Sequence, residues 1–373
     1  MKVVVTGIGL VSCLGNLNRS WENLLQGKSA VRLDQPFGEL PPQPLGLIDS
    51  QPTDLTRLTK QVVENAIASA GLALPLPECG VVIGSSRGYQ AMLEKLALQL
   101  QSEASYSLFP NFLSHTAAIV TADRIGSTGP VLAPMAACAT GIWAIAQAVE
   151  LIQTGQCQQV VAGAVEAPIS PLTLTGFRRM GALAQTGAYP FDRNREGLVL
   201  GEGGAVLVME SAELAKRRLA RIYGQIRGFA LTNDACYANS PDLGGRSAMR
   251  AIAQCLDRSS LFARDIDYIH AHGTATQLND RHEANLIQQI FPHRVPVSST
   301  KGATGHTLGA SGALGAAFCL MALKDQVLPP CVGLREPEFD LDFVRLARWS
   351  QVQNVLCLSF GFGGQNAAIA LCA

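Results

Sequence analysis

The stretch "PMAACATGIWAIAQAV", Pro134–Val149, places a single cysteine directly in front of an apolar helical pattern that carries no charge. It belongs to a longer uncharged run, Ser127–Val149, and a second uncharged run of small residues covers Gly302–Leu323. Such lengths meet the criterion for a membrane span, but two prolines, few leucines and no basic flank argue against one. A helix that is apolar all round is typical of a fully covered core. We therefore expect two buried central helices and no membrane span.

The composition indicates an ordered globular protein. The chain has 373 residues, of which 48% are hydrophobic and 16% are charged, enough to bury a large core. Lysines plus arginines number 29, as do aspartates plus glutamates, so the charge balance does not favour nucleic-acid binding. The N-terminus "MKVVVTGIGLVSCLG" shows no secretory or transit pattern, and the ten cysteines form no C-x-x-C pair. We expect a cytoplasmic protein with mostly buried free thiols.

Runs rich in Val, Ile and Leu alternate with helical patterns, which favours an α/β protein with covered sheets. A hint of duplication accompanies this alternation. "GPVLAPMAAC", Gly129–Cys138, and "VPVSSTKGATGH", Val295–His306, both lead from a strand through a small-residue turn into an uncharged helix. The expected strands are Val3–Thr6, Gly80–Ile83, Gln159–Ala162, Ala205–Met209, Ile266–Ala271, Val295–Ser298 and Val355–Leu358. The expected helices are Trp21–Leu25, Leu55–Ala70, Ala139–Gln153, Ala212–Leu219, Ser247–Leu256, Arg281–Phe291 and Ser311–Leu323.

Cys138 is a candidate nucleophile because it lies where a strand passes into a helix. Free amide groups and the positive end of the helix dipole stabilise a thiolate there and can bind a developing oxyanion. The small residues around it leave room for a substrate. The alternative is an inert buried cysteine, which is the common state of a cysteine in an apolar stretch.

Three histidines mark a second chemical segment, "DYIHAHGTATQLNDRHE", Asp267–Glu283. His272 ends a strand, and functional sites of α/β proteins gather at such ends. His270 and His272 share one strand face, so a metal site with His282 as third ligand is an alternative. For His270 itself a core histidine with satisfied hydrogen bonds is the simpler interpretation.

Lys301 and His306 lie in a third segment, "SSTKGATGHTLGASGALGAA", Ser298–Ala317. It is not a phosphate-binding P-loop, because the lysine precedes the glycines instead of following them. We expect tight packing that lets both side chains point into a pocket. In the C-terminal "LCLSFGFGGQNAAIAL", Phe362 could offer its backbone N–H and gate a pocket with its ring, or the glycines could simply form a hairpin.

Taken in order, these segments resemble the β-ketoacyl-acyl-carrier-protein synthases of the elongating type, which carry a Cys-His-His triad. The resemblance covers most of the chain and rests on six segments. They are "VVVTGIGLVS", "ACATG", "PFDRNREGLVLGEG", "HGTATQLND", "TKGATGHTLGASG" and "SFGFGGQN".

The resemblance implies a thiolase-like α/β fold, with duplicated βαβαβαβ halves in a five-layer α-β-α-β-α arrangement and usually a homodimer. It implies a first half over residues 1–215, with a cap insertion at about 85–125 and the nucleophile Cys138. The second half, residues 216–373, would carry His272, Lys301 and His306.

The resemblance also implies the chemistry. Cys138 would take an acyl chain from acyl carrier protein and condense it with malonyl thioester, with decarboxylation, in fatty acid elongation. The backbone N–H groups of Cys138 and Phe362 would form the oxyanion hole, and no metal or organic cofactor would be needed. His272 and His306 would bind the malonyl thioester, and Lys301 would orient the site together with Glu283. Phe360 and Phe362 would gate the acyl pocket. The residues that would support the site or line its tunnel are Asp280, Thr274, Thr276 and Thr304.

Ala136, Gln277, Gly302 and Gln365 depart from residues common in that family, and Glu78–Asn111 matches poorly. They bear on substrate choice and leave a dedicated synthase for a specialised lipid or polyketide as an alternative. A third hypothesis, a non-catalytic partner that sets chain length, is opposed by the presence of Cys138 and both histidines.

Acyl carrier proteins are acidic, so their docking requires a local basic patch. Arg57 and Lys60 lie three residues apart on one predicted helix and match the part of the family that carries such residues. An ordinary solvated face is the alternative. A competing basic patch is "KRRLAR", Lys216–Arg221, although helix-dipole complementation also explains that run.

Overall fold

The computed structural model describes residues 1–99 and 112–373, and its main feature is a hydrogen-bonded path of strands that runs through two similar halves. The first half contains, in spatial order, β1 (Val3–Ser12), β9 (Gly203–Ser211), β7 (Gln159–Glu166), β5 (Gly80–Gly84) and β6 (Val131–Leu132). The second contains β10 (Gly224–Asn233), β17 (Gln365–Cys372), β16 (Asn354–Gly361), β11 (Tyr268–His270), β12 (Pro296–Ser298) and β14 (Asp342–Phe343).

Both halves repeat the same pairing pattern. In the first, β1–β9 and β9–β7 are antiparallel, whereas β7–β5 and β5–β6 are parallel. In the second, β10–β17 and β17–β16 are antiparallel, whereas β16–β11 and β11–β12 are parallel. The halves meet where β1 pairs with β10 over Val3–Val5. The expected boundary at residues 215 and 216 falls within α8 (Ala212–Arg217), between the two sets of strands, and stays a prediction.

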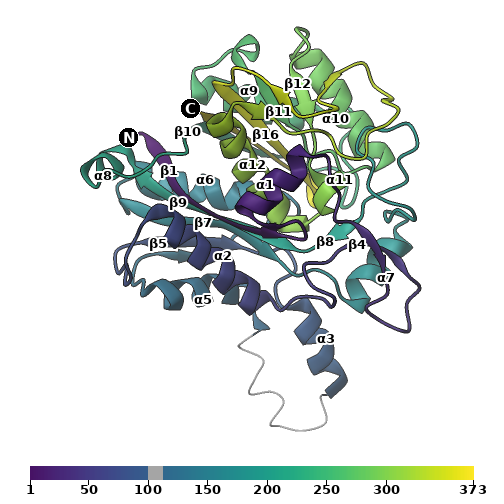
Figure 1. Ribbon diagram of the computed structural model, residues 1–373, viewed down its shortest axis with the longest axis horizontal. Helices are drawn as coiled ribbons and strands as arrows, with labels where there is room; N and C mark the ends of the chain where they lie inside the picture. Colours follow the sequence, from purple (N-terminus) through teal and green to yellow (C-terminus); the bar gives the residue numbers. More distant parts are fainter. Residues whose placement is uncertain (100–111) are drawn as a thin grey trace.

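Figure 1 shows the helices and strands stacked in five layers. The central layer contains α6 (Thr140–Gln153) and α12 (Ser311–Asp325), which share one hydrophobic core with the inner faces of the strands. On the outside, α2 (Leu55–Ala70) and α5 (Thr116–Ile125) cover the first half, and α9 (Arg246–Ser259) and α10 (Gln277–Ile290) cover the second.

Small residues allow α6 and α12 to approach closely. A Cβ atom added at Gly141 would lie 2.4 Å from the backbone nitrogen of Ala313, and one at Gly312 would lie 2.9 Å from the Ile142 side chain. The segment Leu308–Asp325 is long and apolar enough to cross a membrane, but 89% of it is buried inside the protein. It is therefore a core helix, as its sequence predicted.

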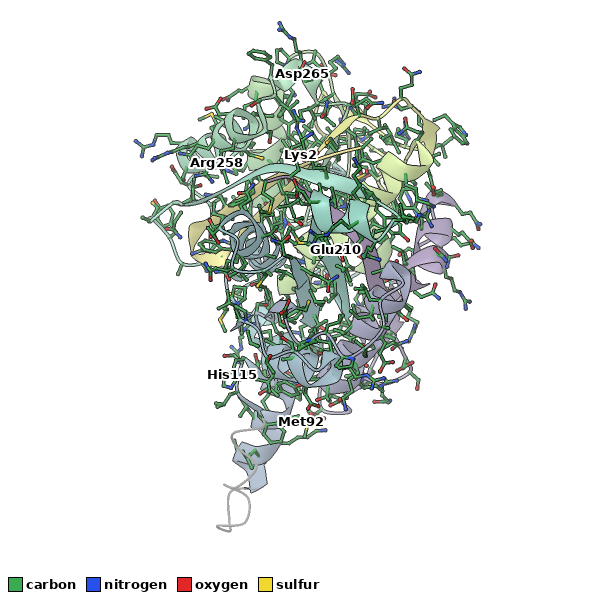
Figure 2. The ribbon with its side chains drawn as sticks, turned by 90° about the vertical axis from the view of Figure 1, so that its left-hand side faces the viewer. Lys2, Met92, His115, Glu210, Arg258 and Asp265 are labelled. Carbon is green, nitrogen blue, oxygen red and sulfur yellow. The ribbon has the colours of Figure 1, made fainter. Side chains whose placement is uncertain are left out.

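The smaller elements complete the body. Of the predicted cap at about 85–125, α3 (Gln90–Gln99) projects from the body in Figure 1, residues 100–111 lie outside the described residues, and α5 packs beside α2. Figure 2 shows Met92 and His115 at this end of the molecule and Asp265 at the opposite end. The remaining elements are β2 (Gly15–Asn16), α1 (Leu17–Leu25), β3 (Arg32–Asp34), β4 (Gln43–Gly46), α7 (Pro171–Arg179), β8 (Leu200–Gly201), α11 (Lys301–Thr304), β13 (Val327–Leu328), β15 (Arg348–Trp349) and the short 3-10 turns Ala263–Asp265, Leu308–Ala310 and Phe362–Gly364.

Candidate active site

Cys138 lies in the turn between β6 and α6. The preceding Ala137 has φ of 47°, a left-handed conformation that is uncommon for a residue with a side chain. The Thr140 hydroxyl holds this turn: it donates to the Ala137 carbonyl at 2.7 Å and accepts from the Ala136 N–H at 2.9 Å. The cysteine is thereby fixed beside the N-terminus of the central helix, as expected.

The C-terminal glycine-rich turn packs directly on this cysteine. The Ser359 hydroxyl donates to the Cys138 carbonyl at 2.9 Å, and a Cβ atom at Gly361 would lie 3.0 Å from the Cys138 backbone nitrogen. The backbone N–H of Phe362 is within hydrogen-bond reach of the Cys138 sulfur. Ser359 was not among the expected site residues, although it stands inside the quoted "SFGFGGQN" segment.

Three reactive side chains from different parts of the sequence converge here. The Cys138 sulfur and one ring nitrogen each of His272 and His306 all lie within 4.8 Å of one another. The two imidazole rings are 5.3 Å apart between centroids and nearly perpendicular, at 83°. All three residues line a cavity of about 250 Å³. His272 follows β11 and His306 precedes α12, so the second half of the fold supplies both histidines.

Burial controls the ionisation of this trio. Burial raises the pKa of Cys138 to about 11, and the positive charge of Lys301 opposes that rise. Burial, followed by the charge of Lys301, holds the pKa of His272 well below its usual range, and the same two causes act on the pKa of His306. The resting site therefore contains a thiol and two neutral imidazoles, whereas the helix terminus alone had suggested a thiolate.

Lys301 and Glu283 fix the backbone of the first histidine. The Glu283 carboxylate accepts from the N–H groups of His272 at 2.6 Å and Gly273 at 2.7 Å. Lys301 Nζ donates to the His272 carbonyl oxygen and lies 3.5 Å from His272 Nδ1. Burial raises the pKa of Glu283 to about 7 and lowers that of Lys301, which the charge of Glu283 opposes.

The other supporting residues divide into two groups. Thr274 and Thr276 line the cavity and share a hydrogen bond of 2.9 Å between their hydroxyls. Asp280 is buried, accepts from the N–H of Phe191 at 2.7 Å and therefore acts on the scaffold. Thr304 is absent from the described lining of the cavity. Its hydroxyl donates to the Gly305 carbonyl at 2.8 Å, and its expected place along the substrate tunnel stays a prediction.

Aromatic side chains surround the cysteine. Phe360 and Phe362 both line the cavity, and their role as its gate stays a prediction. The Phe362 ring stacks on Phe177 of α7, with centroids 6.0 Å apart, and the guanidinium of Arg87 lies 5.5 Å from the Phe177 centroid. Sequence reasoning missed Phe177 and Arg87, because nothing in their local sequence indicates this contact across the fold.

The expected docking residues lie on α2, away from the cavity lining. Arg57 is largely committed to other groups, since its guanidinium pairs with Asp49 and donates to the Thr53 hydroxyl at 2.8 Å. Lys60 is on the same helix and takes part in none of the salt bridges found between described residues. In the competing patch, Lys216–Arg221, Arg218 is bound to Glu210.

The alternative metal site is not assembled as expected. Within residues 1–99 and 112–373, the one group of three close ligand-type side chains is Cys138, His272 and His306. His270 does not join it and instead contacts Thr300 and Cys357. His282 lies on α10, with its ring 6.3 Å from that of Phe360.

A duplicated five-layer fold with a cysteine at the N-terminus of the central helix, facing two neutral histidines, defines a thiolase-like condensing acyltransferase. The family models described as the N-terminal and C-terminal domains of beta-ketoacyl synthase match residues 32–215 and 223–335. The chain belongs to the β-ketoacyl synthase family.

Its relatives include enzymes of two kinds. It is 35% identical to 3-oxoacyl-[acyl-carrier-protein] synthase 2 of Synechocystis sp., with 99% of this chain and 97% of the relative covered. It is equally 35% identical to the tetracenomycin polyketide synthase ketoacyl synthase alpha subunit of Streptomyces glaucescens, covering 99% and 96%. A solved beta-ketoacyl synthase from Burkholderia phymatum superposes with a TM-score of 0.88 at 30% identity, covering 100% and 99% of the chains.

Proposed function

We propose that the protein is a 3-oxoacyl-[acyl-carrier-protein] synthase that elongates acyl chains by decarboxylative condensation with a malonyl thioester. The observation that carries this proposal is the convergence of Cys138, His272 and His306 within 4.8 Å of one another at one cavity. A nucleophile and two neutral imidazoles suit covalent acyl transfer followed by stabilisation of an enolate.

In the first step, the Cys138 sulfur attacks the thioester carbonyl of an acyl chain. Because the resting group is a thiol, its proton must leave as the sulfur–carbon bond forms, and a neutral imidazole of the trio accepts it. The N–H groups of Cys138 and Phe362 stabilise the oxyanion. The tetrahedral adduct collapses, the carrier thiol departs with the proton, and the acyl chain remains on the sulfur.

In the second step, the malonyl thioester binds with its carbonyl oxygen toward His272 and His306. Both side chains are neutral, so each can donate one N–H to this oxygen. Loss of carbon dioxide leaves an enolate, whose carbon attacks the acyl-Cys138 carbonyl. The carbon–sulfur bond breaks, the 3-oxoacyl product is released, and the sulfur takes up a proton from solvent. Neither a metal ion nor an organic cofactor is needed, because the malonyl carboxylate supplies the electron pair.

The acyl and malonyl groups arrive on acyl carrier protein. A structurally similar type II polyketide ketosynthase, at a TM-score of 0.93 and 28% identity with 100% and 99% coverage, was solved in complex with its acyl-carrier protein. Lys60, with Arg57 beside it, is the cationic site that we assign to carrier docking. A cytoplasmic location suits this partner and the ten cysteines, which are free in the structure.

A second copy of the chain is the partner proposed for the edge strand β6. This strand ends the sheet path, and Leu132 on it is 38% exposed, with Met135 nearby at 59%. An exposed apolar edge strand favours pairing with another chain. Light scattering at several protein concentrations should give a dimer of identical chains; a monomer at all concentrations would contradict this assignment.

A dedicated synthase for a specialised lipid or polyketide is the second candidate, because the Streptomyces relative belongs to a polyketide pathway. The test that decides between them is turnover with a series of acyl-carrier thioesters of rising length, followed by mass spectrometry. Bulk elongation predicts one 3-oxoacyl product per saturated primer across the series. Repeated extension of one primer without intervening reduction would favour the polyketide alternative.

A further inference from the structure

His270 is a second buried histidine on β11, two residues before His272, and the proposed reaction does not use it. Its side chain is 2% exposed, and each ring nitrogen has a partner. Nε2 lies 3.2 Å from the Thr300 hydroxyl, and Nδ1 lies 3.8 Å from the Cys357 sulfur. These contacts join three neighbouring strands, because β11 lies between β12, which leads to Thr300, and β16, which carries Cys357.

The central helix makes space for this pair. A Cβ atom at Gly315 of α12 would lie 2.8 Å from His270 Cε1 and 2.9 Å from the Cys357 sulfur. Both distances are shorter than ordinary contacts, so α12 crosses here only because residue 315 is glycine. The His270 ring is thus held by close packing against α12 as well as by its polar contacts.

Cys357 and Thr300 each contact one ring nitrogen of His270. The Cys357 sulfur lies beside Nδ1 and the Thr300 hydroxyl lies beside Nε2. Because a hydroxyl can both donate and accept, the hydrogen bond to Thr300 forms with either tautomer of the ring. The two contacts together fix the orientation of the imidazole.

The position of Thr300 determines where the Lys301 side chain begins. Thr300 immediately precedes α11, and its carbonyl accepts from the N–H groups of Ala303 at 3.0 Å and Thr304 at 3.1 Å. The next side chain, Lys301, returns to the His272 carbonyl. A continuous set of contacts therefore leads from His270 through Thr300 and Lys301 to His272, which lies two residues after His270 in the sequence.

We propose that His270 is a positioning residue, which holds Thr300 through Nε2 and so places the Lys301 ammonium against His272 and near Cys138. This inference rests on the proposed condensing function and adds a residue to it that touches no substrate. Lysine placement matters because a misplacement of about 1 Å in such a site can reduce a rate by roughly a hundredfold.

The test compares variants that keep or remove the bond to Thr300. Thr300→Val removes the hydroxyl without changing the volume greatly. His270→Asn has no polar atom at the Nε2 position, so its shorter side chain cannot reach Thr300. His270→Gln can still reach Thr300 with its terminal amide. Thr6→Val is the matched control, since it removes another buried threonine hydroxyl, on β1, outside the site. Each variant is first shown to unfold at a temperature close to that of the wild type.

We expect Thr300→Val and His270→Asn to lower kcat for condensation about tenfold with little change in KM, and the double variant to be no worse than either single variant. His270→Gln should recover most of kcat, and Thr6→Val should match the wild type. Folded Thr300→Val with wild-type kcat, or additive losses in the double variant, would overturn the proposal.

A second readout needs no turnover. Alkylation of Cys138 by iodoacetamide, followed on its own peptide by mass spectrometry, reports the charge that Lys301 presents to the thiol. The alkylation profile of Thr300→Val should move to higher pH, and that of Thr6→Val should not. An unchanged alkylation profile for Thr300→Val would contradict the positioning role. Failure of the wild-type protein to catalyse condensation would instead contradict the proposed function.

Discussion

Lys301 Nζ lies 3.5 Å from His272 Nδ1 and donates to the carbonyl oxygen of the same residue, so a buried cation adjoins a catalytic candidate that must stay neutral. Burial and then this cation keep the pKa of His272 well below its usual range. The same cation opposes the burial that raises the pKa of Cys138. One lysine therefore favours a neutral imidazole and a more reactive thiol together.

Removal of the Lys301 charge should lower the reactivity of the Cys138 thiol. Lys301→Met combined with Glu283→Gln removes both buried charges at once, which avoids leaving an unpaired carboxylate. The pKa of Cys138 should rise above about 11, and the alkylation profile should move to higher pH. Each unit by which the pKa of Cys138 rises lowers the thiolate fraction about tenfold. Glu283→Gln alone, with the lysine retained, is the control; equal profiles for the two variants would contradict this electrostatic role.

Loss of one histidine should affect the second step more than the first, because the other imidazole can still accept the Cys138 proton, whereas the malonyl carbonyl loses one of its two donors. His272→Ala or His306→Ala removes one donor to the malonyl carbonyl, which costs about 3 kcal/mol of transition-state stabilisation, or roughly a hundredfold in rate. Carbon dioxide release and acyl-Cys138 formation are measured separately on each variant. The assigned roles predict a much larger loss of decarboxylation, and equal losses in both steps would show that the roles are wrong.

Substitution of a glycine in the central helices by alanine should destabilise the protein. At an exposed helix position the same substitution normally stabilises a protein by about 1 kcal/mol. At Gly141 the new methyl group would lie 2.4 Å from the Ala313 backbone nitrogen, so Gly141→Ala should instead destabilise the protein by about 1–3 kcal/mol. Gly176→Ala on α7 is the control, because no atom lies within 4 Å of that added group. Urea unfolding of both variants checks the opposite signs.

Charge reversal on α2 should impair the carrier-bound substrate selectively. Because Arg57 is paired with Asp49, the exposed Lys60 should be the more sensitive position. Lys60→Glu is expected to raise KM for acyl carrier protein thioesters, more so at low salt, and to leave a pantetheine thioester unaffected. Lys216→Glu on the competing patch is the comparison variant. A larger effect of Lys216→Glu than of Lys60→Glu would move the docking site to Lys216–Arg221.

Much of this fold could be predicted from local sequence because the sheets are buried on both faces. Each expected strand and helix overlaps an element of the structure, since apolar runs of strand length and uncharged helices leave few alternatives. The strand β10, Gly224–Asn233, was not predicted because Gln225, Arg227 and Thr232 interrupt its apolar run. The helix α5 was assigned to a cap because its contacts with α2 come from a distant part of the chain.

The candidate site was predictable to a similar degree and for a related reason. Cys138 and His306 each stand between a strand and a small-residue helix, and His272 ends a strand, so their local patterns indicated a common place. Thr304 shared such a pattern, yet its hydroxyl turns to the backbone. His270 was predicted to be a core histidine with satisfied hydrogen bonds, and its burial and its contacts with Thr300 and Cys357 confirm this. Phe177 could not be assigned, because its significance lies in a contact with Phe362 that only the folded chain brings within reach.

The central claim is that Cys138 carries the acyl chain between the two halves of the reaction. The most direct measurement is the intact mass of the protein after incubation with an acyl carrier thioester, and again after addition of malonyl carrier thioester. We predict one acyl adduct on the Cys138 peptide, its disappearance on addition of malonyl thioester as the 3-oxoacyl product appears, and neither event in Cys138→Ala. Condensation by Cys138→Ala at the wild-type rate, or an acyl adduct on another residue that is consumed instead, would contradict the account.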